Sequence, residues 1–265
     1  MKPPRPLWPA WKPIALRLKA APRLAVFSDF DGTLAPIVRH PGQSRLPAPT
    51  RAALVRLGRL SGVAVGIVSG RSLRDLRAKV RLRKICYIGS HGLEWTGPDG
   101  QRHSKVSAAL ASHLQELGRK LEAEVGRLPG IYVERKTLSI AVHYRNATPR
   151  VARQARQAAE RRAKRAAKKL RLLRGKKIVE LLPAGRMDKG QAVMALAGRL
   201  RRRGGPRPLL IYLGDDTTDE TVFPRLRRGD LGIHVGPGAG SRAQYRLASP
   251  AEVTRFLVRL REVLA

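Results

Sequence analysis

The stretch LAVFSDFDGTL, residues 24–34, decides the fold. Its first five residues form a short apolar run, which is typical of a buried strand in a parallel sheet. Asp29 and Asp31 follow at the carboxyl end of this strand, and Gly32 and Thr33 suit a tight loop whose backbone N–H groups face an anion. The stretch therefore predicts a strand that delivers two carboxylates to a site. Taken alone, it also fits a solvated loop that happens to carry two acids.

The chain around this stretch alternates strands and helices. Apolar runs predict further strands at residues 63–68, 85–89, 209–213 and 231–235, and helical spacing of apolar residues predicts helices at 50–60 and 73–80. This alternation favours an α/β fold with a parallel sheet and right-handed crossovers. Asp29, Ser69 and Asp215 each follow a predicted strand, so we expect them to converge beyond one edge of the sheet.

The middle of the chain has a different pattern. It predicts a helix over residues 103–128, an antiparallel hairpin over 131–134 and 138–144, a long basic helix from 149 to 173 and a strand over 178–182. Such a block between two parts of a parallel sheet predicts an inserted α/β domain at residues 99–183. The core domain would then comprise residues 23–98 and 184–265.

Residues 1–22 are basic and contain six prolines. We expect a loosely ordered extension with Trp8 and Trp11 packed on the domain surface; a docking arm is the alternative. The segment lacks the apolar stretch of a secretory signal, and no apolar run approaches the ~20 residues that span a bilayer. The single cysteine, Cys86, lies in an apolar run and is most simply a reduced core residue. We therefore expect a cytoplasmic monomer without membrane insertion.

Acidic residues gather in GDDTTDE, residues 214–220, which holds four of the 19 acids of the chain. Clustered carboxylates beyond a strand repel one another unless a cation offsets them, which indicates a hard divalent metal. Mg²⁺ fits, because it prefers oxygen ligands and is often shared with a substrate phosphate. A helix N-terminus also favours acids, and this accounts for Glu220 and in part for Asp219, but not for Asp215.

Two further motifs fit the chemistry of a phosphate ester. Ser69, Gly70 and Arg71 offer a hydroxyl and backbone donors to a phosphoryl oxygen, although Ser-Gly is also an ordinary turn. Lys189, ahead of an apolar helical face, supplies the positive charge that a pentavalent phosphorus needs. Two carboxylates at i and i+2 can divide the labour, since one attacks phosphorus while the other exchanges protons with the leaving group and with water. The four motifs together predict a metal-assisted phosphoryl-transfer site.

The order DxDGT, SGR, DKG and GDD resembles the haloacid-dehalogenase-like (HAD) phosphohydrolases. The resemblance implies a Rossmann-like parallel-sheet core with an inserted α/β cap domain that determines substrate specificity. It implies Asp29 as the nucleophile that forms an aspartyl-phosphate, Asp31 as general acid and base, and Ser69 and Lys189 as phosphate binders. It also implies Mg²⁺ held by Asp29, the Asp31 carbonyl and Asp215, with Asp216 in or beside the ligand set.

Four longer stretches narrow the resemblance to the trehalose-6-phosphate phosphatases: GSHGLEW (89–95), ERKTLSIAVHYRNA (134–147), VELLPAGRMDKG (179–190) and GDDTTDETVF (214–223). In that family the cap supplies a Glu-x-Lys pair and a further Glu to the sugar hydroxyls, and the matching residues are Glu134, Lys136 and Glu180. The resemblance thus implies Mg²⁺-dependent hydrolysis of trehalose 6-phosphate. Glu134 and Lys136 also fit a surface pair, whereas an acid inside the apolar strand around Glu180 is harder to explain structurally.

Two other functions stay open. One is a phosphatase for another sugar phosphate, such as sucrose 6-phosphate or a glycosyl-phosphoglycerate. The other is a non-catalytic polyanion-binding protein built on a phosphatase fold. The presence of every expected acid, hydroxyl and lysine argues against the second. The sequence also departs from the usual family pattern at Asp188, where Asn or Ser is more usual before the lysine.

The second departure is the charge, because 54 Lys and Arg against 19 acids give a net charge of +35. Residues 150–177 contain 13 of these cations and a single acid, Glu160. A second cluster comprises Arg199, Arg201, Arg202, Arg203 and Arg207. Cations around most of a helix cannot all face a core, so we expect a solvated surface that binds polyanions non-specifically, incidental to function. Aromatic residues are only 5% and are not interleaved with this run, which argues against a single-strand stacking platform.

Overall fold

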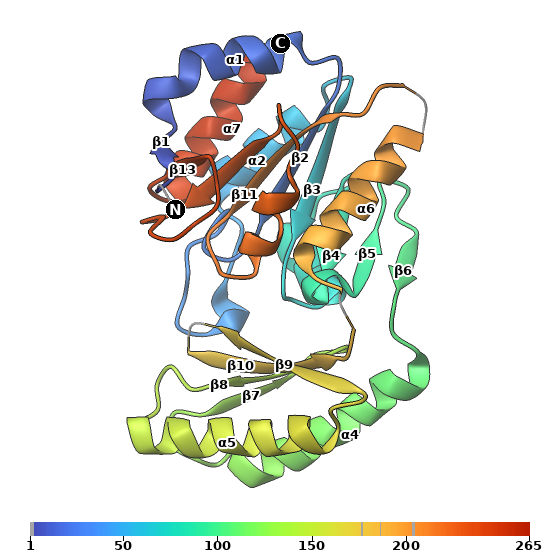
Figure 1. The fold of residues 1–265 in the computed structure, drawn as a ribbon, viewed down its shortest axis with the longest axis vertical. Helices are drawn as coiled ribbons and strands as arrows, with labels where there is room; N and C mark the ends of the chain where they lie inside the picture. Colours follow the sequence, from blue (N-terminus) through green and yellow to red (C-terminus); the bar gives the residue numbers. More distant parts are fainter. Residues whose placement is uncertain (1–2, 176, 186, 203–204) are drawn as a thin grey trace. The chain divides into compact units, whose positions relative to one another are not determined.

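The computed structural model describes residues 3–175, 177–185, 187–202 and 205–265 (Figure 1). The chain divides into two compact units. Unit 1 comprises Met1–His103 and Met187–Ala265, and unit 2 comprises Ser104–Arg186. Unit 2 thus begins five residues later and ends three residues later than the inserted domain predicted at residues 99–183.

A nine-stranded sheet forms the centre of unit 1. Its strands, in spatial order, are β1 (Arg5–Pro6), β13 (Tyr245–Leu247), β12 (Leu231–Val235), β11 (Leu209–Gly214), β2 (Leu24–Asp29), β3 (Val63–Val68), β4 (Cys86–Gly89), β5 (Glu94–Thr96) and β6 (Arg102–Ser104). The pairs from β1 to β4 are parallel, and β5 runs antiparallel to β4. The chain leaves β2 toward β3 and β4 and later returns to its other side through β11. Strand order reverses at β2, and such a switch point is where ligands bind in open α/β sheets.

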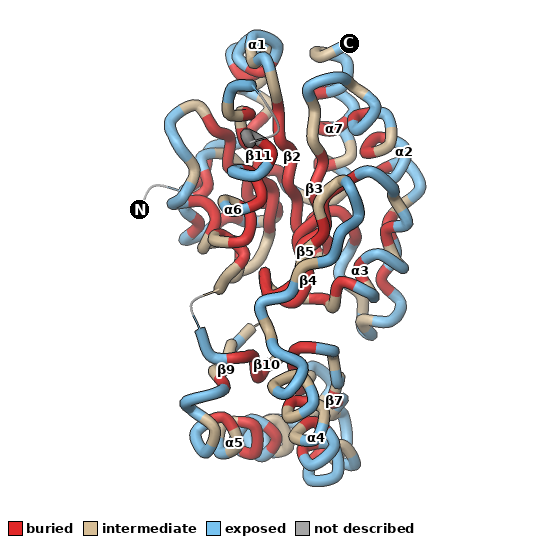
Figure 2. Tube along the Cα trace, turned by 90° about the vertical axis from the view of Figure 1, so that its right-hand side faces the viewer, coloured by how far each residue is buried: buried red, intermediate tan, exposed pale blue. Residues whose placement is uncertain are grey.

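Helices cover both faces of this sheet. The helices of unit 1 are α1 (Trp11–Ala20), α2 (Ala48–Leu57), α3 (Leu73–Val80), α6 (Lys189–Arg202) and α7 (Pro250–Leu264), with 3₁₀ turns η1 (Trp8–Ala10), η2 (Pro41–Gln43), η3 (Ser90–Gly92), η4 (Asp219–Thr221) and η5 (Phe223–Arg225). Side chains alternate along β2, so Val26 belongs to the apolar cluster that includes residues of α1, α2, α3 and α7, while Phe27 belongs to the cluster that includes residues of α6. Both faces of the central strands are therefore buried, as Figure 2 shows for β2, β3 and β11. Among the described residues, no helix combines the length and apolar character needed to cross a membrane.

The predicted α/β class is confirmed, and every predicted strand and helix of unit 1 is present to within three residues. The reason is physical: a parallel strand covered on both faces must be apolar throughout, which makes short apolar runs a strong signal. Two elements at the ends of the chain, β1 and β13, are too short to carry such a run.

The expectation of a loosely ordered N-terminus was wrong. Arg5 and Pro6 pair with β13, and α1 buries Ile14 and Leu18. Pro13 does not break α1, because it lies in the first turn, where backbone N–H groups have no intrahelical acceptor. The proline content had concealed the helical spacing of the apolar residues.

The two tryptophans of this segment pack on the domain as expected. The Trp8 indole N–H donates to Glu252 over 3.0 Å, and the Trp11 ring meets Phe256 edge to face with centroids 5.8 Å apart. Glu252 and Phe256 both belong to α7. The N-terminal segment is therefore an integral part of unit 1.

Unit 2 is a four-stranded antiparallel sheet with two helices on one face. Its elements are α4 (Ala108–Val125), β7 (Tyr132–Arg135), β8 (Ile140–His143), α5 (Pro149–Arg165), β9 (Leu170–Gly175) and β10 (Ile178–Pro183), and the strand order is β7-β8-β10-β9. Val133, Val142 and Val179 point to the helices and pack with Leu121 and Ala159. The intervening residues of the strands point to the opposite face.

The helix predicted from residue 149 to 173 was wrong in its last eight residues. The helix α5 ends at Arg165, and residues 170–175 form β9, which pairs with β10. Leu170 is buried and Leu172 packs against the same apolar cluster, which is the two-residue alternation of a strand. A long run of Lys, Arg and Ala, all good helix formers, had concealed this short alternation.

Candidate active site

The carboxyl end of β2 places Asp29 in a buried position. Asp29 is the last residue of β2 and is 4% exposed. The following turn is closed by hydrogen bonds from the Gly32 N–H to the Ala35 carbonyl (2.7 Å) and from the Ala35 N–H to the Phe30 carbonyl (2.9 Å). Gly32 has a φ of +86°, and a Cβ there would overlap the Asp215 carboxylate. Only glycine combines this backbone conformation with so close an approach.

Lys189 binds Asp29 directly. Its ammonium lies 2.7 Å from Asp29 Oδ1 and 2.9 Å from Asp219 Oδ1, and all three side chains are buried. Burial raises the pKa of Asp29, and Lys189 opposes this effect. Burial would lower the pKa of Lys189, but Asp219 and Asp29 outweigh it and raise that pKa, so the lysine is charged. Lys189 is 160 residues from Asp29 in the sequence, and the two residues meet at this site as predicted.

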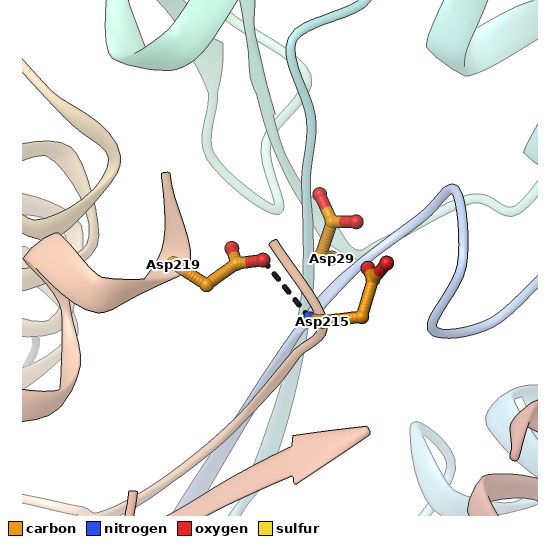
Figure 3. Close-up of side chains that lie close together, drawn as sticks. All are labelled: Asp29, Asp215 and Asp219. Atoms are coloured by element: carbon orange, nitrogen blue, oxygen red, sulfur yellow. Dashed lines mark hydrogen bonds between the residues drawn. The ribbon is translucent and has the colours of Figure 1, made fainter. Parts of the chain in front are cut away.

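Asp29, Asp215 and Asp219 form a compact acidic group (Figure 3). One carboxylate oxygen from each lies within 4.8 Å of the others. Burial and the nearby charge of Asp219 raise the pKa of Asp215 to about 7. Three carboxylates against one ammonium leave an excess of negative charge in a buried place, and oxygen donors of this kind suit a hard divalent cation.

Asp219 serves as an anchor within this group. Its Oδ1 accepts from Lys189 and from the Tyr212 hydroxyl (2.6 Å), and its Oδ2 accepts from the backbone N–H groups of Asp215 (3.1 Å) and Asp216 (3.0 Å). A carboxylate has about four acceptor positions, so these four bonds occupy them. The carboxylates left for a cation are therefore those of Asp29 and Asp215.

Asp219 was predicted in part as an acid of a helix N-terminus. It does begin the 3₁₀ turn η4, but it is fully buried and holds the backbone of the GDD motif in place. The four-residue spacing between Asp215 and Asp219 was the available signal. Asp216 lies next to Asp215 but outside the compact acidic group, and its side chain accepts from Thr217 (3.3 Å).

Thr33 also belongs to this site. Its hydroxyl donates to Asp215 Oδ1 over 2.9 Å, and its side chain is buried. Thr33 therefore joins the loop after β2 to the loop after β11. The predicted convergence of these two loops is thereby observed as a direct bond.

The loop after β3 places Ser69 and Gly70. Ser69 is buried, and its hydroxyl accepts from the Arg71 backbone N–H over 3.1 Å. Its carbonyl accepts from the His91 N–H (3.1 Å), and a Cβ on Gly70 would overlap the His91 ring. Ser90 and His91 both have positive φ values, 48° and 55°, which are uncommon for residues with a side chain. The 3₁₀ turn η3 thus packs against the Ser69–Gly70 loop and holds it in place through His91.

Arg71 and Asp31 form a bidentate ion pair. Arg71 Nε donates to Asp31 Oδ2 over 2.6 Å and Nη2 donates to Oδ1 over 2.7 Å. Asp31 lies outside the compact acidic group and is more exposed than Asp29. The structure therefore brings Arg71, expected at the phosphate, onto the residue expected to act as general acid and base.

The Asp188 departure has a local explanation. Asp188 Oδ1 accepts from the Gln191 N–H over 2.7 Å, which is the hydrogen bond of a helix N-cap at the start of α6. Its other oxygen pairs with Arg225 (3.1 Å). Asn and Ser are also good N-caps, so the three residue types share this role before Lys189.

Unit 2 carries the three residues expected at the sugar. Register places Ala141 of β8 between Glu134 of β7 and Glu180 of β10, so the two acids lie on the same face, opposite the helices. Glu180 Oε1 accepts from Lys136 (2.9 Å) and from the Ser139 hydroxyl (2.5 Å). Ser139 was not among the residues predicted from the sequence.

Glu134 pairs with a histidine on the same face. Its Oε2 lies 2.9 Å from Nε2 of His143. Burial would raise the pKa of Glu134, but the bond to His143 and the charge of Lys136 outweigh it and lower that pKa. Glu134 and His143 thus form a hydrogen-bonded pair on the face of the unit 2 sheet that also carries Glu180.

Comparison with known proteins decides the family. The model of the trehalose-phosphatase family matches residues 27–251. The chain belongs to this family. The resemblance drawn from the motifs is therefore confirmed.

Curated relatives agree with this assignment. A trehalose-phosphate phosphatase of Mycobacterium avium (strain 104) is 40% identical over 248 residues, which cover 91% of this chain and 62% of the relative. One of Mycobacterium tuberculosis (strain ATCC 25618 / H37Rv) is 38% identical over 241 residues, covering 89% and 61%. The chain thus spans less than two thirds of the length of these relatives.

Solved structures share the fold. The C-terminal domain of a Candida albicans trehalose-6-phosphate phosphatase has a TM-score of 0.83 at 21% identity, with both chains covered completely. A trehalose-6-phosphate phosphatase related protein has a TM-score of 0.76 at 26% identity over 90% of this chain and 97% of its own. A HAD-like hydrolase of Bacteroides thetaiotaomicron has a TM-score of 0.65 at 16% identity, covering 90% and 99%. The predicted HAD-like core with an inserted cap is confirmed as the fold class.

Proposed function

We propose that this chain hydrolyses trehalose 6-phosphate to trehalose and inorganic phosphate. The observation that carries the proposal is the buried Asp29 at the end of β2, paired with Lys189 and beside Asp215. Membership of the trehalose-phosphatase family supports it. The curated relatives of similar sequence are named trehalose-phosphate phosphatases.

The reaction has two steps. An oxygen of Asp29 attacks phosphorus, the bond from phosphorus to the sugar oxygen breaks, and Asp31 gives its proton to that oxygen. Water then attacks the aspartyl-phosphate, gives a proton to Asp31, and releases phosphate while the Asp29 carboxylate is restored. Each step thus forms one bond to phosphorus and breaks one, and Asp31 returns to its starting state.

Several groups would bind the phosphoryl oxygens. The Ser69 hydroxyl and the backbone N–H groups of Thr33 and Gly70 lie in the two loops after β2 and β3, whereas the Gly32 N–H, also expected at the phosphate, donates to the Ala35 carbonyl. Lys189 would balance the charge that develops on phosphorus. The low-dielectric surroundings of its buried ammonium strengthen this effect.

We propose Mg²⁺ as the cofactor. The Asp29 and Asp215 carboxylates and the Asp31 carbonyl would hold it, with Asp216 next to this set. Two observations support the fit: the buried excess of negative charge, and the raised pKa of Asp215, which burial and Asp219 cause. When bound, Mg²⁺ supplies positive charge to the phosphoryl oxygens.

Glu134, Lys136 and Glu180 are proposed to recognise the sugar. Carboxylates accept hydrogen bonds from hydroxyls and an ammonium donates to them, so a fixed set of both distinguishes a disaccharide from a small alcohol. The bonds from Lys136 and Ser139 hold Glu180 in place. Glu134, Lys136 and Glu180 argue against sucrose 6-phosphate and glycosyl-phosphoglycerate as substrates only because they match the sugar-binding residues of the trehalose-phosphatase family. Both esters are therefore included in the test.

The test is phosphate release from a panel of sugar phosphates, with Mg²⁺ and with EDTA. We expect metal-dependent release from trehalose 6-phosphate, and none from an Asp29→Asn variant that thermal unfolding shows to be folded. Release from another sugar phosphate alone would change the substrate and keep the chemistry. No release from any ester would refute the proposal.

The basic surface of unit 2 supports a second, weaker activity. The buried face of α5 consists of Ala155, Ala158, Ala159 and Ala163, which turns its cations outward. Arg150, Arg153, Lys164, Arg165, Lys168, Lys169 and Lys177 are exposed. Lys176 and Arg203, which belong to the two basic clusters, lie outside the described residues. We propose that this surface binds polyanions non-specifically.

Salt dependence tests this binding. We expect affinity for duplex DNA to fall steeply between about 50 and 200 mM salt, because counterion release drives such contacts. Binding that persists at about 200 mM salt and prefers one sequence would contradict a non-specific role.

We further propose that the chain acts in the cytoplasm as a monomer. Cys86 is buried and is the one cysteine of the sequence, so no disulfide can form within the chain, which suits a reducing compartment. Light scattering coupled to size exclusion tests the oligomeric state. A mass near twice the 29.2 kDa of the chain would contradict the monomer.

A further inference from the structure

The guanidinium of Arg71 is occupied by acceptors within the protein. Besides its two bonds to Asp31, Nη1 donates to Asp75 Oδ2 (2.7 Å) and Nη2 donates to the Pro41 carbonyl (2.9 Å). Arg71 therefore uses four of its five N–H donors. Its side chain is only 8% exposed. A substrate phosphate would have to displace these partners to reach it.

Asp31 is held on both oxygens by donors. Oδ2 accepts from Arg71, and Oδ1 accepts from Arg71 and from the Ser44 hydroxyl over 2.8 Å. A bidentate fork fixes the plane of a carboxylate, and Ser44 adds a third bond from a different segment. The three donors together fix the position and the plane of the Asp31 carboxylate.

The two segments that hold Asp31 are themselves tied together. Lys79 of α3 donates to the Gly42 carbonyl (2.9 Å) and to the Ser44 carbonyl (3.3 Å). Asp75 lies one turn before Lys79 on the same helix, so α3 supports both the Arg71 anchor and the Ser44 segment. Arg71 also lies 5.6 Å from the centre of the Phe30 ring, next to Asp31 in sequence. The helix α3 therefore supports the orientation of Asp31 through Arg71 and through the Ser44 segment.

We propose that Arg71 is a positioning residue for Asp31. It orients the Asp31 carboxylate to take the proton from the water that hydrolyses the aspartyl-phosphate. In that step the water oxygen bonds to phosphorus, its proton passes to Asp31, and the bond from phosphorus to Asp29 breaks. The inference rests on the proposed function and replaces the expected contact between Arg71 and the substrate phosphate.

The two roles of Arg71 predict opposite kinetics with p-nitrophenyl phosphate. Nitrophenolate leaves without a proton, so the first step does not need Asp31 as an acid. Loss of a positioning residue slows only the second step, and phosphoenzyme accumulates. Loss of a phosphate ligand slows the first step, and phosphoenzyme does not accumulate.

The experiment is stopped-flow release of nitrophenolate by the full chain with Mg²⁺. For Arg71→Ala we expect a burst approaching one equivalent per enzyme, followed by a steady rate about 10- to 100-fold below wild type, part of the ~10²–10⁴ that general acid–base catalysis contributes. The inhibition constant of inorganic phosphate should stay within about twofold. Arg71→Lys keeps the charge but not the fork, so it should recover only part of the rate.

Three further variants guard against misfolding. Asp75→Asn and Ser44→Ala each remove one support of the Arg71–Asp31 pair, and both should show a smaller burst of the same kind. Arg74→Ala, an exposed arginine of the same helix, is the matched control and should behave as wild type. Thermal unfolding of each variant reports whether the fold is retained.

Two results would overturn the inference. An Arg71→Ala variant without a burst and with weaker phosphate inhibition would make Arg71 a phosphate ligand. Folded Asp75→Asn and Ser44→Ala variants with wild-type kinetics would show that the hydrogen bonds of Asp75 and Ser44 do not position Asp31 for the reaction. A wild-type chain inactive toward every ester would instead refute the proposed function, and the positioning role with it.

Discussion

The ammonium of Lys189 lies 2.7 Å from a carboxylate oxygen of Asp29, and both side chains are almost fully buried. Asp219 accepts a second bond from the same ammonium over 2.9 Å. Buried charges of this kind are stable only while each has its partner. The charge of the candidate nucleophile is therefore coupled to the stability of unit 1.

Removal of this lysine should destabilise unit 1 strongly. Lys189→Met leaves two carboxylates buried without a cation, which costs about 3–5 kcal/mol for a broken buried pair. The double variant Lys189→Met with Asp219→Asn should recover part of this loss. Urea unfolding of metal-free protein measures both. Equal stabilities of wild type and the single variant would show that the carboxylates find another partner.

The proposed metal site should affect the free energy of unfolding as well as the activity. Burial and Asp219 raise the pKa of Asp215 to about 7, so its ionised form is disfavoured in the metal-free fold. The stability that the protonated carboxyl supports is lost as the pH rises through about 7. Asp215→Asn should therefore be more stable than wild type without metal at about pH 8.

Mg²⁺ should reverse this order. At 100 times its dissociation constant a ligand stabilises the fold by about 2.7 kcal/mol, and the variant lacks the carboxylate that binds it. Thermal unfolding with Mg²⁺ and with EDTA, beside phosphate release, measures the effect. A variant that gains as much stability from Mg²⁺ as wild type would remove Asp215 from the ligands.

Glu180 should distinguish the sugar from the phosphate. Glu180→Gln keeps the acceptor for Ser139 but loses the charge beside Lys136. We expect kcat/KM for trehalose 6-phosphate to fall about 10- to 100-fold, the equivalent of a charged hydrogen bond of about 1.5–3 kcal/mol, with little change for p-nitrophenyl phosphate. Glu124→Gln, which loses ion pairs to Arg161 and Arg162 on the helical side, is the control. Equal losses on both esters would assign Glu180 a structural role.

His234 should make stability depend on pH. Burial lowers the pKa of His234, despite the charges of Glu220 and Asp219, and its buried Nδ1 has no hydrogen-bond partner among the described residues. The unfolded histidine has a pKa of about 6.5, so the unfolded chain binds the proton more readily. The stability from the neutral ring is complete above about pH 6.5 and is lost as the pH falls toward the lower folded value.

The matching variant is His234→Gln. Urea unfolding at about pH 7.5 and pH 5.5, on either side of the unfolded pKa, should show a smaller loss of stability for the variant than for wild type. The difference between the two proteins isolates His234 from the carboxyl groups that also titrate. Identical losses would mean that the ring is protonated within the fold.

Most of unit 1 could be predicted because its signals are local. A strand such as β2, covered on both faces, is an unbroken apolar run, and the residue that follows it is placed by topology. Asp29, Ser69 and Asp215 were located this way. Lys189 was located by its motif, and the Lys189–Asp29 bond shows that the motifs do meet.

The rest depends on contacts between distant segments. Ser44 lies in a loop without periodicity, and nothing near it in sequence indicates a bond to Asp31. Asp219 reads as an ordinary acid of a helical turn until Tyr212 and Lys189 are placed around it. The end of α5 was missed for a different reason, since helix-forming residues continue past Arg165 into β9.

The pairing of β1 with β13 bears on how the protein can be handled. A chain trimmed to begin at Pro22 would leave the outer hydrogen-bonding groups of β13 open and would uncover the apolar surface that Leu7, Ile14 and Leu18 cover. Open strand edges and apolar patches recruit other copies of a chain. Such a trimmed protein should aggregate at concentrations where the full chain stays dispersed, which light scattering can follow. We therefore expect the proline-rich N-terminal segment, through β1 and α1, to prevent self-association of the protein.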